Sequence, residues 1–367
     1  MYSLIRSSSI IIGVLCSVNV FFHIKGLSFI RILGEKKRIL PYIAALIFAC
    51  LNMYFMREAF STVWMALIHV SLSLIACDVI SLVIRLFGRD TKVRRVWKKL
   101  MGAGLAFALS ALVIAYGLIN MAVVRETRYT LVNRNVQGSI VIGLISDVHL
   151  GTAMDAEKFD RVLERTLEAG AEIIVLAGDI VDEGTTQAEF DTLCEYLSAR
   201  RAPKGTYYVY GNHDASRYSG ILTKDAIEQA LTKAGVTVLT DESIFIDGWL
   251  RIAGRKDAND RKRLSAKELL KDADAESEFI VLIDHQPAQT ASCAEAGADL
   301  LLSGHTHNGQ IWPIGPLSNL LKINEIEYGH EEIGDMDAIV SSGAAGWACA
   351  FRTGGRSEYV IIDVSGK

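Results

Sequence analysis

The feature that most constrains this chain is an arrangement that recurs five times. A short apolar run ends in a cluster of aspartate, histidine, asparagine or glycine, and the first copy is Ser139–Ile145 followed by Asp147 and His149. Short apolar runs of this kind indicate strands that are buried on both faces. Residues two apart on an extended chain point to the same side, so Asp147 and His149 can reach one metal ion together.

The other four copies follow the same plan. Their apolar runs are Ile173–Ala177, Thr206–Tyr210, Phe279–Ile283 and Leu300–Leu302. The polar residues that follow these runs are, in order, Gly178 and Asp179; Gly211, Asn212, His213 and Asp214; His285; and Gly304, His305 and His307. Segments 155–169, 187–200 and 223–234 read as helices between them. Alternating strands and helices predict an α/β sheet, whose sites lie at the carboxyl ends of its strands.

The residue types in these clusters predict a metal centre. Five of the eight histidines in the chain lie in them. Histidine and carboxylate ligands suit Mn, Fe or Zn. The candidate ligands outnumber what one tetrahedral ion needs, which favours a pair of ions about 3.5–4 Å apart. Glycine at the strand ends lets the backbone turn sharply and approach a ligand closely.

The order of the five clusters resembles the calcineurin-like metallophosphoesterase family, in its membrane-attached bacterial branch, over about residues 140–363. The resemblance implies a four-layer α/β (α+β) sandwich of two packed sheets flanked by helices. It also implies a set of metal ligands: Asp147, His149 and His307 for one ion, Asn212, His285 and His305 for the other, and Asp179 between both.

The same resemblance implies hydrolysis of a phosphomonoester, phosphodiester or pyrophosphate by a water that two cations acidify. His213 would stand beside the scissile phosphate, and Asp214 would orient the ring of His213. Asp182 would support the metal ligands without binding a metal itself. Asp284 reads either as such a supporting residue or as a polar strand end, and Asn308 departs from the glycine that relatives often have there.

The first third of the chain has a different composition. Residues 1–124 contain 14 Lys and Arg but 4 Asp and Glu, whereas the rest contains 24 and 38. Four apolar stretches approach or exceed the length that spans a bilayer: Leu4–Ile24, Ile39–Met56, Val63–Phe87 and Leu100–Val124. We expect four spanning helices over 1–124, a connector over 125–138 and the phosphoesterase domain over 139–367. The first stretch reads alternatively as a cleaved signal peptide.

Charge predicts the orientation of these helices. The stretches 25–38 and 88–99 are rich in Lys and Arg, and basic loops stay in the cytoplasm. Both termini and the phosphoesterase domain are therefore expected outside the cytoplasm of a multi-pass membrane protein. Asp78 and His69, inside the third stretch, are expected to pair within the bundle. The acidic second part excludes nucleic acid as a partner, because that needs a basic face.

Two segments bear on the substrate, and each has two readings. The basic run Arg255–Arg263 is either a solvated loop or a clamp for an anionic group. The apolar stretch Ile311–Leu317, with Leu320 and Leu321, is either buried against the sheet or in contact with lipid. The clamp and the lipid contact both predict a phosphoester on a lipid or lipid-linked sugar. The alternative to an enzyme is a membrane sensor or scaffold whose phosphoesterase domain binds a ligand.

Overall fold

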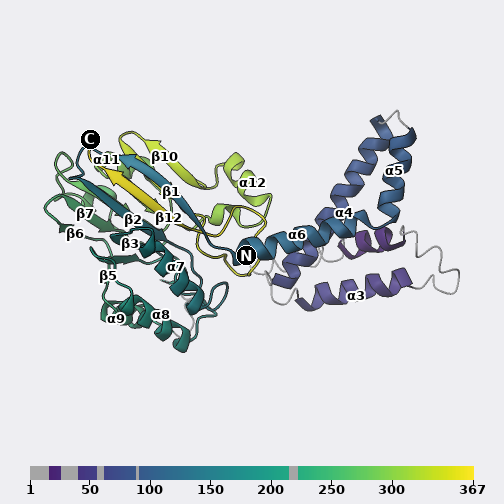
Figure 1. The fold of residues 1–367 in the computed structure, drawn as a ribbon, viewed down its shortest axis with the longest axis horizontal. Coiled ribbons are helices and arrows are strands. Elements are labelled where there is room, and N and C mark those ends of the chain that lie inside the picture. The colour runs from purple at the N-terminus through teal and green to yellow at the C-terminus, as the bar shows by residue number, and fades with distance from the viewer. Residues whose placement is uncertain (1–15, 26–39, 56–61, 88–90, 215–221) are drawn as a thin grey trace. The chain divides into compact units, whose positions relative to one another are not determined.

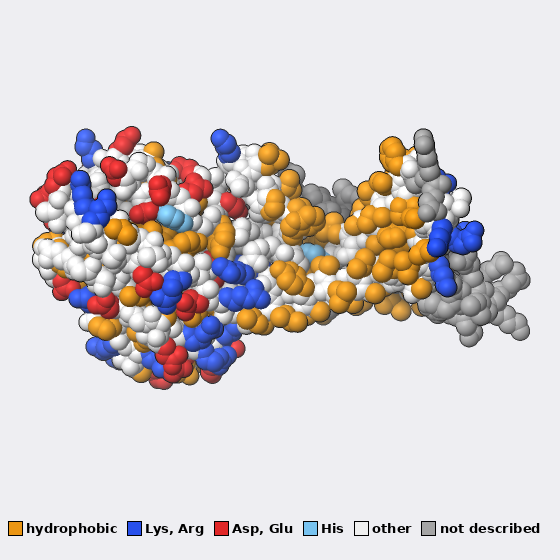
Figure 2. Space-filling model, turned by 45° about the horizontal axis from the view of Figure 1, so that its top comes forward, with side chains coloured by type: hydrophobic (Ala, Val, Ile, Leu, Met, Phe, Trp, Pro, Cys, Tyr) orange, Lys and Arg blue, Asp and Glu red, His pale blue; other side chains and the backbone are white. Residues whose placement is uncertain are grey.

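The chain divides into two compact units, Met1–Ile119 and Asn120–Lys367. A computed structural model describes residues 16–25, 40–55, 62–87, 91–214 and 222–367 (Figure 1). The first unit is helical, and the second contains both sheets. Hydrophobic side chains cover much of the visible surface of the helical unit, whereas side chains of both charges are interspersed over the other (Figure 2).

Four predicted spanning helices are not confirmed. Residues 16–25 are helical, and they are followed by α3 (Leu40–Phe55), α4 (Thr62–Phe87), α5 (Thr91–Gly102) and α6 (Leu105–Ala122). Among the described residues, only α4 and α6 are long and apolar enough to cross a bilayer. The beginning of the first predicted span and the predicted loops at 26–38 and 57–58 lie outside the described residues.

The predicted basic loop over 88–99 is largely a helix, α5. Its apolar residues Val93, Val96 and Leu100 recur at helical spacing, so a helix gathers them on one side and the cations on the other. Helix α5 is tied to α4, since Trp97 Nε1 donates to Ser81 Oγ (2.7 Å) and Arg94 Nη2 donates to the carbonyl of Arg85 (2.7 Å).

The polar groups of α4 are paired within the helical unit, as expected. Asp78 accepts a hydrogen bond from Asn19 Nδ2 (3.2 Å) and lies 3.0 Å from His23 Nε2, both on the helical segment 16–25. His69 Nδ1 lies 2.8 Å from the carbonyl of Met65, one turn earlier. These contacts account for both residues as local structure.

The first sheet of the second unit has the strand order β1-β12-β2-β3-β4-β5. Its strands are β1 (Arg125–Val132), β2 (Ser139–Ile145), β3 (Ile173–Ala177), β4 (Thr206–Val209), β5 (Val236–Val238) and β12 (Glu358–Ser365). Strands β2 to β5 are parallel neighbours, and β12 runs antiparallel to β2. Helices α7 (Ala156–Glu168), α8 (Gln187–Ala199) and α9 (Lys224–Lys233) lie beside this sheet in Figure 1.

The second sheet has the order β10-β11-β9-β8-β7-β6. Its strands are β6 (Glu242–Ile246), β7 (Leu250–Gly254), β8 (Phe279–Ile283), β9 (Leu300–Ser303), β10 (Gly329–Ile333) and β11 (Met336–Val340). Strands β7, β8, β9 and β11 are parallel, and the two edge strands are antiparallel to their neighbours. The remaining elements are α10 (Ala266–Leu269), α11 (Thr290–Glu295), the short helix η2 (His307–Gly309) and α12 (Ile314–Leu321).

Three apolar clusters hold the second unit together. The central one joins the inner faces of the sheets, for example Ile142 and Val175 from the first with Val281 and Leu302 from the second. A second cluster packs α7, α8 and α9 on the outer face of the first sheet. The third packs α10 and α11 on the outer face of the second sheet. The expected mixed α/β architecture with two packed sheets is therefore confirmed.

Two predicted segments of this unit are wrong. Residues 125–132 are not a connector but strand β1, which pairs in parallel with β12. Its charged residues misled the prediction because β1 is an edge strand with only two fully buried positions. Residues 347–352, predicted as a strand, have no regular secondary structure. The expected domain boundaries stay a prediction.

Candidate metal centre

Five loops at the carboxyl ends of β2, β3, β4, β8 and β9 deliver the predicted site residues. The first three strands are parallel neighbours in one sheet, and the last two are parallel neighbours in the other. Parallel strands place their carboxyl ends at the same edge. The site therefore forms where the corresponding edges of the two packed sheets meet.

The backbone of these loops is strained. Asp147, His149, Asp179, His305 and His307 all have positive φ, between 46° and 72°. This conformation costs a residue with a side chain roughly 1–2 kcal/mol. Such a concentration of strain is typical of functional sites, where the fold holds side chains that the loop alone would not hold.

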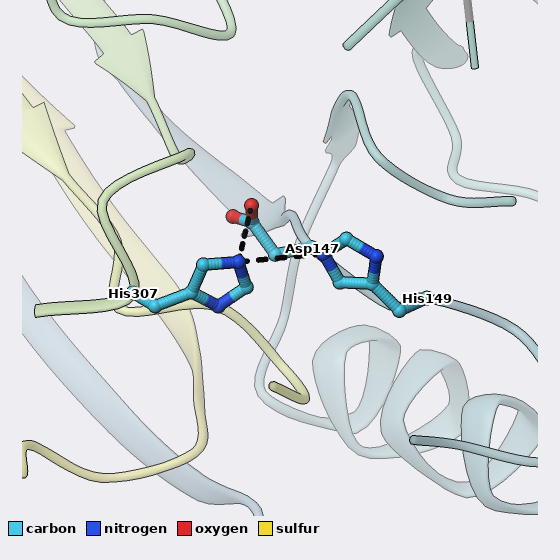
Figure 3. A group of neighbouring side chains, drawn as sticks. All are labelled: Asp147, His149 and His307. Carbon is cyan, nitrogen blue, oxygen red and sulfur yellow. Dashed lines mark hydrogen bonds and ion pairs between the residues drawn. The ribbon is translucent and has the colours of Figure 1, made fainter. Parts of the chain in front are cut away.

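Asp147, His149 and His307 form the first ligand group, and all three are buried (Figure 3). His307 Nε2 lies 3.3 Å from His149 Nε2 and 3.5 Å from Asp147 Oδ1. His149 Nδ1 donates to Asp182 Oδ2 (3.0 Å), which leaves a lone pair on His149 Nε2. Burial lowers the pKa of His307 to about 3, so its imidazole is neutral. Converging lone pairs and a carboxylate are the donor set of a divalent transition metal.

Asp179, His285 and His305 form the second ligand group. His285 Nδ1 donates to the carbonyl of Ala177 (2.7 Å), which points Nε2 at Asp179 Oδ2, 3.1 Å away. The rings of His285 and His305 lie 5.2 Å apart between centroids. Asn212 Oδ1 accepts a hydrogen bond from Gln286 Nε2 (3.5 Å), and Gln286 is the residue after His285.

Asp179 lies between the two groups. The same oxygen, Oδ2, is 3.1 Å from His285 Nε2 and 4.0 Å from His149 Nε2. Burial alone would raise the pKa of Asp179, but His285 beside it holds that pKa well below its usual range. Burial lowers the pKa of His285, but Asp179 outweighs it and raises that pKa to about 10. A cation bound by His285 Nε2 would therefore have to displace a proton from this nitrogen.

Glycines make room for these carboxylates. A Cβ on Gly178 would lie 2.6 Å from the backbone nitrogen of Gly211 and 2.7 Å from His285 Nδ1, and Gly178 has φ of 84°. A Cβ on Gly304 would collide with the carboxylate of Asp147. Only glycine fits at both positions, which explains why each lies directly at a strand end.

The predicted role of Asp214 differs from its observed contacts. The buried Asp214 carboxylate accepts hydrogen bonds from the backbone nitrogens of Asp179 (2.6 Å), Ile180 (2.9 Å), Val181 (2.8 Å) and Gly211 (2.9 Å). It therefore ties the β3 loop to the β4 loop. The ring of His213 is held by Asp182, whose Oδ1 lies 3.1 Å from His213 Nδ1.

Asp182 thus supports two rings, and its effect on His213 is electrostatic as well. Burial lowers the pKa of His213, but the hydrogen bond with Asp182 and the charge of Asp179 outweigh burial and raise that pKa to about 9. His213 is consequently a cation at neutral pH in this environment. A positioned imidazolium can donate a proton to an oxygen that carries developing negative charge.

Asp284 pairs with two arginines of the basic run. Asp284 accepts hydrogen bonds at Oδ2 from Arg255 Nη1 and at Oδ1 from Arg263 Nη1, each at 3.1 Å. The side chains of Arg255 and Arg263 are buried, whereas Arg261 and Lys262 are exposed. The reading of the run as a fully solvated loop is therefore wrong for its first and last residues. The clamp for an anion stays a prediction.

Arg352 contributes to the site although the sequence did not mark it as a candidate. This residue is fully buried, and its Nη2 donates to the carbonyls of Ser342 (2.9 Å) and Ala345 (2.6 Å). Ala345 in turn donates its backbone N–H to the carbonyl of Asp147 (3.0 Å). Arg352 therefore braces the loop that supports Asp147. No motif surrounds Arg352, and the only signal was an arginine at the end of an apolar segment.

Comparisons with known proteins agree with this geometry. A family model described as calcineurin-like phosphoesterase matches residues 140–309. An uncharacterized metallophosphoesterase of Aquifex aeolicus is 30% identical over 268 residues, which are 71% of this chain and 98% of that protein. One of Campylobacter jejuni is 27% identical over 305 residues, covering 80% and 77% of the two chains. A transmembrane protein with metallophosphoesterase domain from Danio rerio is 26% identical over 277 residues, 70% of this chain and 61% of that protein.

Proposed function

Because the chain belongs to the calcineurin-like phosphoesterase family, we propose that it is a membrane-anchored hydrolase that uses two divalent cations to cleave a phosphoester or pyrophosphate bond. The observation that carries the proposal is the place of Asp179. A single carboxylate oxygen lies within 4.0 Å of a histidine nitrogen from each ligand group. A carboxylate shared in this way suits a pair of cations better than one.

Seven residues would hold the cations: Asp147, His149 and His307 on one side, Asn212, His285 and His305 on the other, and Asp179 between them. Mn, Fe and Zn all suit this donor set. When bound, such cations acidify water and neutralise charge on phosphoryl oxygens. Asp182 holds the ring orientations of His149 and His213 through one carboxylate.

His213 would supply the proton that the leaving oxygen needs. Its Nδ1 is directed at Asp182, so Nε2 is the atom that donates. The carboxylate of Asp182, hydrogen-bonded to the ring, favours the protonated form of His213 and raises its pKa. The ring of Trp347, 6.1 Å from that of His213 between centroids, restricts the space beside it. This arrangement orients the ring through Asp182 on one side and Trp347 on the other.

The membrane anchor is proposed from α4 and α6, and a relative named as a transmembrane protein supports it. Five cations and no acidic residue lie on α5. By the bias of basic segments towards the cytoplasm, α5 stays inside. Helix α6, which follows α5 directly, then crosses once. The phosphoesterase unit, which begins at Asn120, would therefore lie outside the cytoplasm.

The proposal is tested with the full chain, reconstituted with Mn, Fe or Zn, on p-nitrophenyl phosphate and bis(p-nitrophenyl) phosphate. Replacing Asp179 by alanine should lower hydrolysis more than about a hundredfold, since it removes the shared ligand. Replacing His213 by alanine should lower it by about 10²–10⁴-fold.

The matched control is His330→Ala, since His330 pairs with Asp337 (2.6 Å) on strands β10 and β11. That variant should hydrolyse both esters at the rate of the wild type. A wild type that hydrolyses neither ester with any of the three metals, while it remains folded, would contradict the proposal.

A further inference from the structure

Helix α12 and the residues beside its two ends expose apolar side chains to solvent. The residues concerned are Trp312 (62% exposed), Ile314 (54%), Leu317 (48%), Leu320 (77%), Leu321 (68%) and Ile323 (68%), here called the α12 patch. The sequence allowed this segment to be buried against the sheet, and the exposed fractions of its side chains rule that reading out. Single exposed apolar residues are ordinary, but six within twelve positions mark an interaction site.

The polar side of α12, by contrast, faces the protein. Ser318 is buried, and its hydroxyl donates to Glu327 Oε2 (2.6 Å), which also accepts from Asn324 Nδ2 (2.8 Å). Gly315 is buried as well, and a Cβ there would lie 2.7 Å from the carbonyl oxygen of Asn308. The helix is therefore seated by its small and polar residues, and its apolar side is directed away from the core.

The patch borders the metal centre. Gly315 packs against Asn308, and Asn308 follows the ligand His307 directly in the chain. Helix η2, from His307 to Gly309, and α12 are connected by four residues. A partner surface that binds α12 would therefore lie next to His307, on one side of the metal centre.

The occupant that fits this patch is a lipid bilayer. No acidic residue occurs between Gln310 and Asn324, while Lys322 adds a cation and Trp312 an indole at its edge. Trp and Lys are typical of the boundary between headgroups and acyl chains, and Lys attracts anionic headgroups.

An apolar helix leads directly into the phosphoesterase unit. The phosphoesterase unit begins at Asn120, within the last turn of the apolar helix α6, and only two residues separate the end of α6 at Ala122 from β1 at Arg125. Within that unit, Asn120 Nδ2 donates to the carbonyl of Gly355 (2.8 Å), and the backbone nitrogen of Trp312 donates to Thr353 Oγ1 (3.1 Å). One loop, 353–355, thus contacts both the entry of the chain into the unit and the start of the α12 patch.

We propose that the α12 patch inserts into the membrane interface beside the metal centre, so that the enzyme acts on phosphoesters carried by lipid headgroups. This inference rests on the proposed hydrolase function and names its substrate class. Insertion would hold the site at the plane where such headgroups lie. A soluble ester would reach the site without the patch.

The test compares lipid and soluble esters with the same kind of bond. The full chain in phosphatidylcholine vesicles is given phosphatidic acid or p-nitrophenyl phosphate, and phosphatidylglycerol or bis(p-nitrophenyl) phosphate. The variant Leu317→Asp/Leu320→Asp/Leu321→Asp should lower lipid hydrolysis by at least about tenfold, equal to ~1.4 kcal/mol, and leave soluble hydrolysis unchanged. The control Phe245→Asp, at a residue 47% exposed on β6, should change neither.

A second readout does not depend on activity. Brominated acyl chains should quench the fluorescence of Trp312, measured as the difference between wild type and Trp312→Phe. The inference is overturned if the triple variant lowers lipid and soluble hydrolysis equally, if it lowers neither, or if the wild type cleaves soluble esters but no lipid ester. Conversion of a dimer into a monomer by the triple variant would also overturn it and assign the patch to a second copy. A wild type that hydrolyses none of these esters would instead contradict the proposed function itself.

Discussion

At the scale of single residues, the site depends on which carboxylate contacts which ring. Asp182 contacts both His149 and His213 through its two oxygens and is itself fully buried. Asp214, although adjacent to His213 in sequence, is used by four backbone amides. Asp182 therefore orients the two imidazole rings, whereas Asp214 stabilises the loops after β3 and β4.

Replacing Asp182 by asparagine should lower kcat by about 10–100-fold, because the two rings lose the acceptor that fixes their orientation. The measurement is steady-state hydrolysis of a soluble ester at saturating metal. Asp191→Asn, on the exposed side of α8, is the matched control and should leave kcat unchanged. Equal kcat values for wild type and Asp182→Asn would remove Asp182 from the account.

Replacing Asp214 by asparagine should act mainly on stability. An amide nitrogen would face backbone donors that now bond a carboxylate, which leaves buried groups unsatisfied at a cost of about 1–3 kcal/mol each. Thermal unfolding of the metal-free chain should show a lower Tm for this variant. An unchanged Tm together with lost hydrolysis would return Asp214 to the role that the sequence suggested.

The positions of the candidate ligands could be predicted from sequence, because the apolar runs and the order of the clusters are local signals. The partner of His213 could not be predicted. Asp182 and Asp214 both follow a buried strand, and only the path of the turns decides which carboxylate reaches the ring. Arg352 was missed for a related reason, since its acceptors are backbone carbonyls of a loop without a motif.

At the scale of elements, the backbones of the loops at the strand ends must pack closely against one another for the two ligand groups to converge. Gly178 and Gly248 make a matched pair, since both have positive φ but only Gly178 is crowded. Gly178→Ala should abolish tight metal binding, because its Cβ would push Gly211 and His285 apart. Gly248→Ala should lower stability by roughly 1–2 kcal/mol through its backbone alone and leave binding intact. Calorimetric metal titration of both variants separates the two effects, and equal affinities would contradict the crowding argument.

The link between β7 and β8 predicts a pH dependence of stability. The hydrogen bond from Arg251 lowers the pKa of Glu278, so the pair stabilises the fold above the unfolded pKa of about 4.3 and loses its effect as pH falls through the folded pKa. Glu278→Gln should therefore have a lower Tm than the wild type at neutral pH. This difference should vanish in acid, and a difference that grows in acid would contradict the sign.

Buried strands were predicted well because an unbroken apolar run has few alternatives. Strand β1 was not, since its charged residues are acceptable only at an edge, and its partner β12 lies more than two hundred residues away. Helix α12 was also missed as a helix, because an apolar stretch that contains Pro313, Gly315 and Pro316 resembles a loop.

At the scale of the whole molecule, two units with different surfaces are joined at Asn120. The proposed orientation, with the phosphoesterase unit outside the cytoplasm, rests on the basic α5 and the single apolar helix after it. A cysteine placed at Lys262, in an exposed loop, should react with an impermeant maleimide in right-side-out membrane vesicles, relative to the wild-type background of native cysteines. Labelling that needs lysis of the vesicles would place the phosphoesterase unit in the cytoplasm.

The measurement that tests the central claim most directly is the metal content of the purified full-length chain, determined by mass spectrometry after loading with Mn, Fe or Zn. The account predicts two cations per chain in the wild type and a marked loss in Asp179→Ala, because one carboxylate serves both ligand groups. A folded wild type that retains no transition metal under any of these conditions would contradict it.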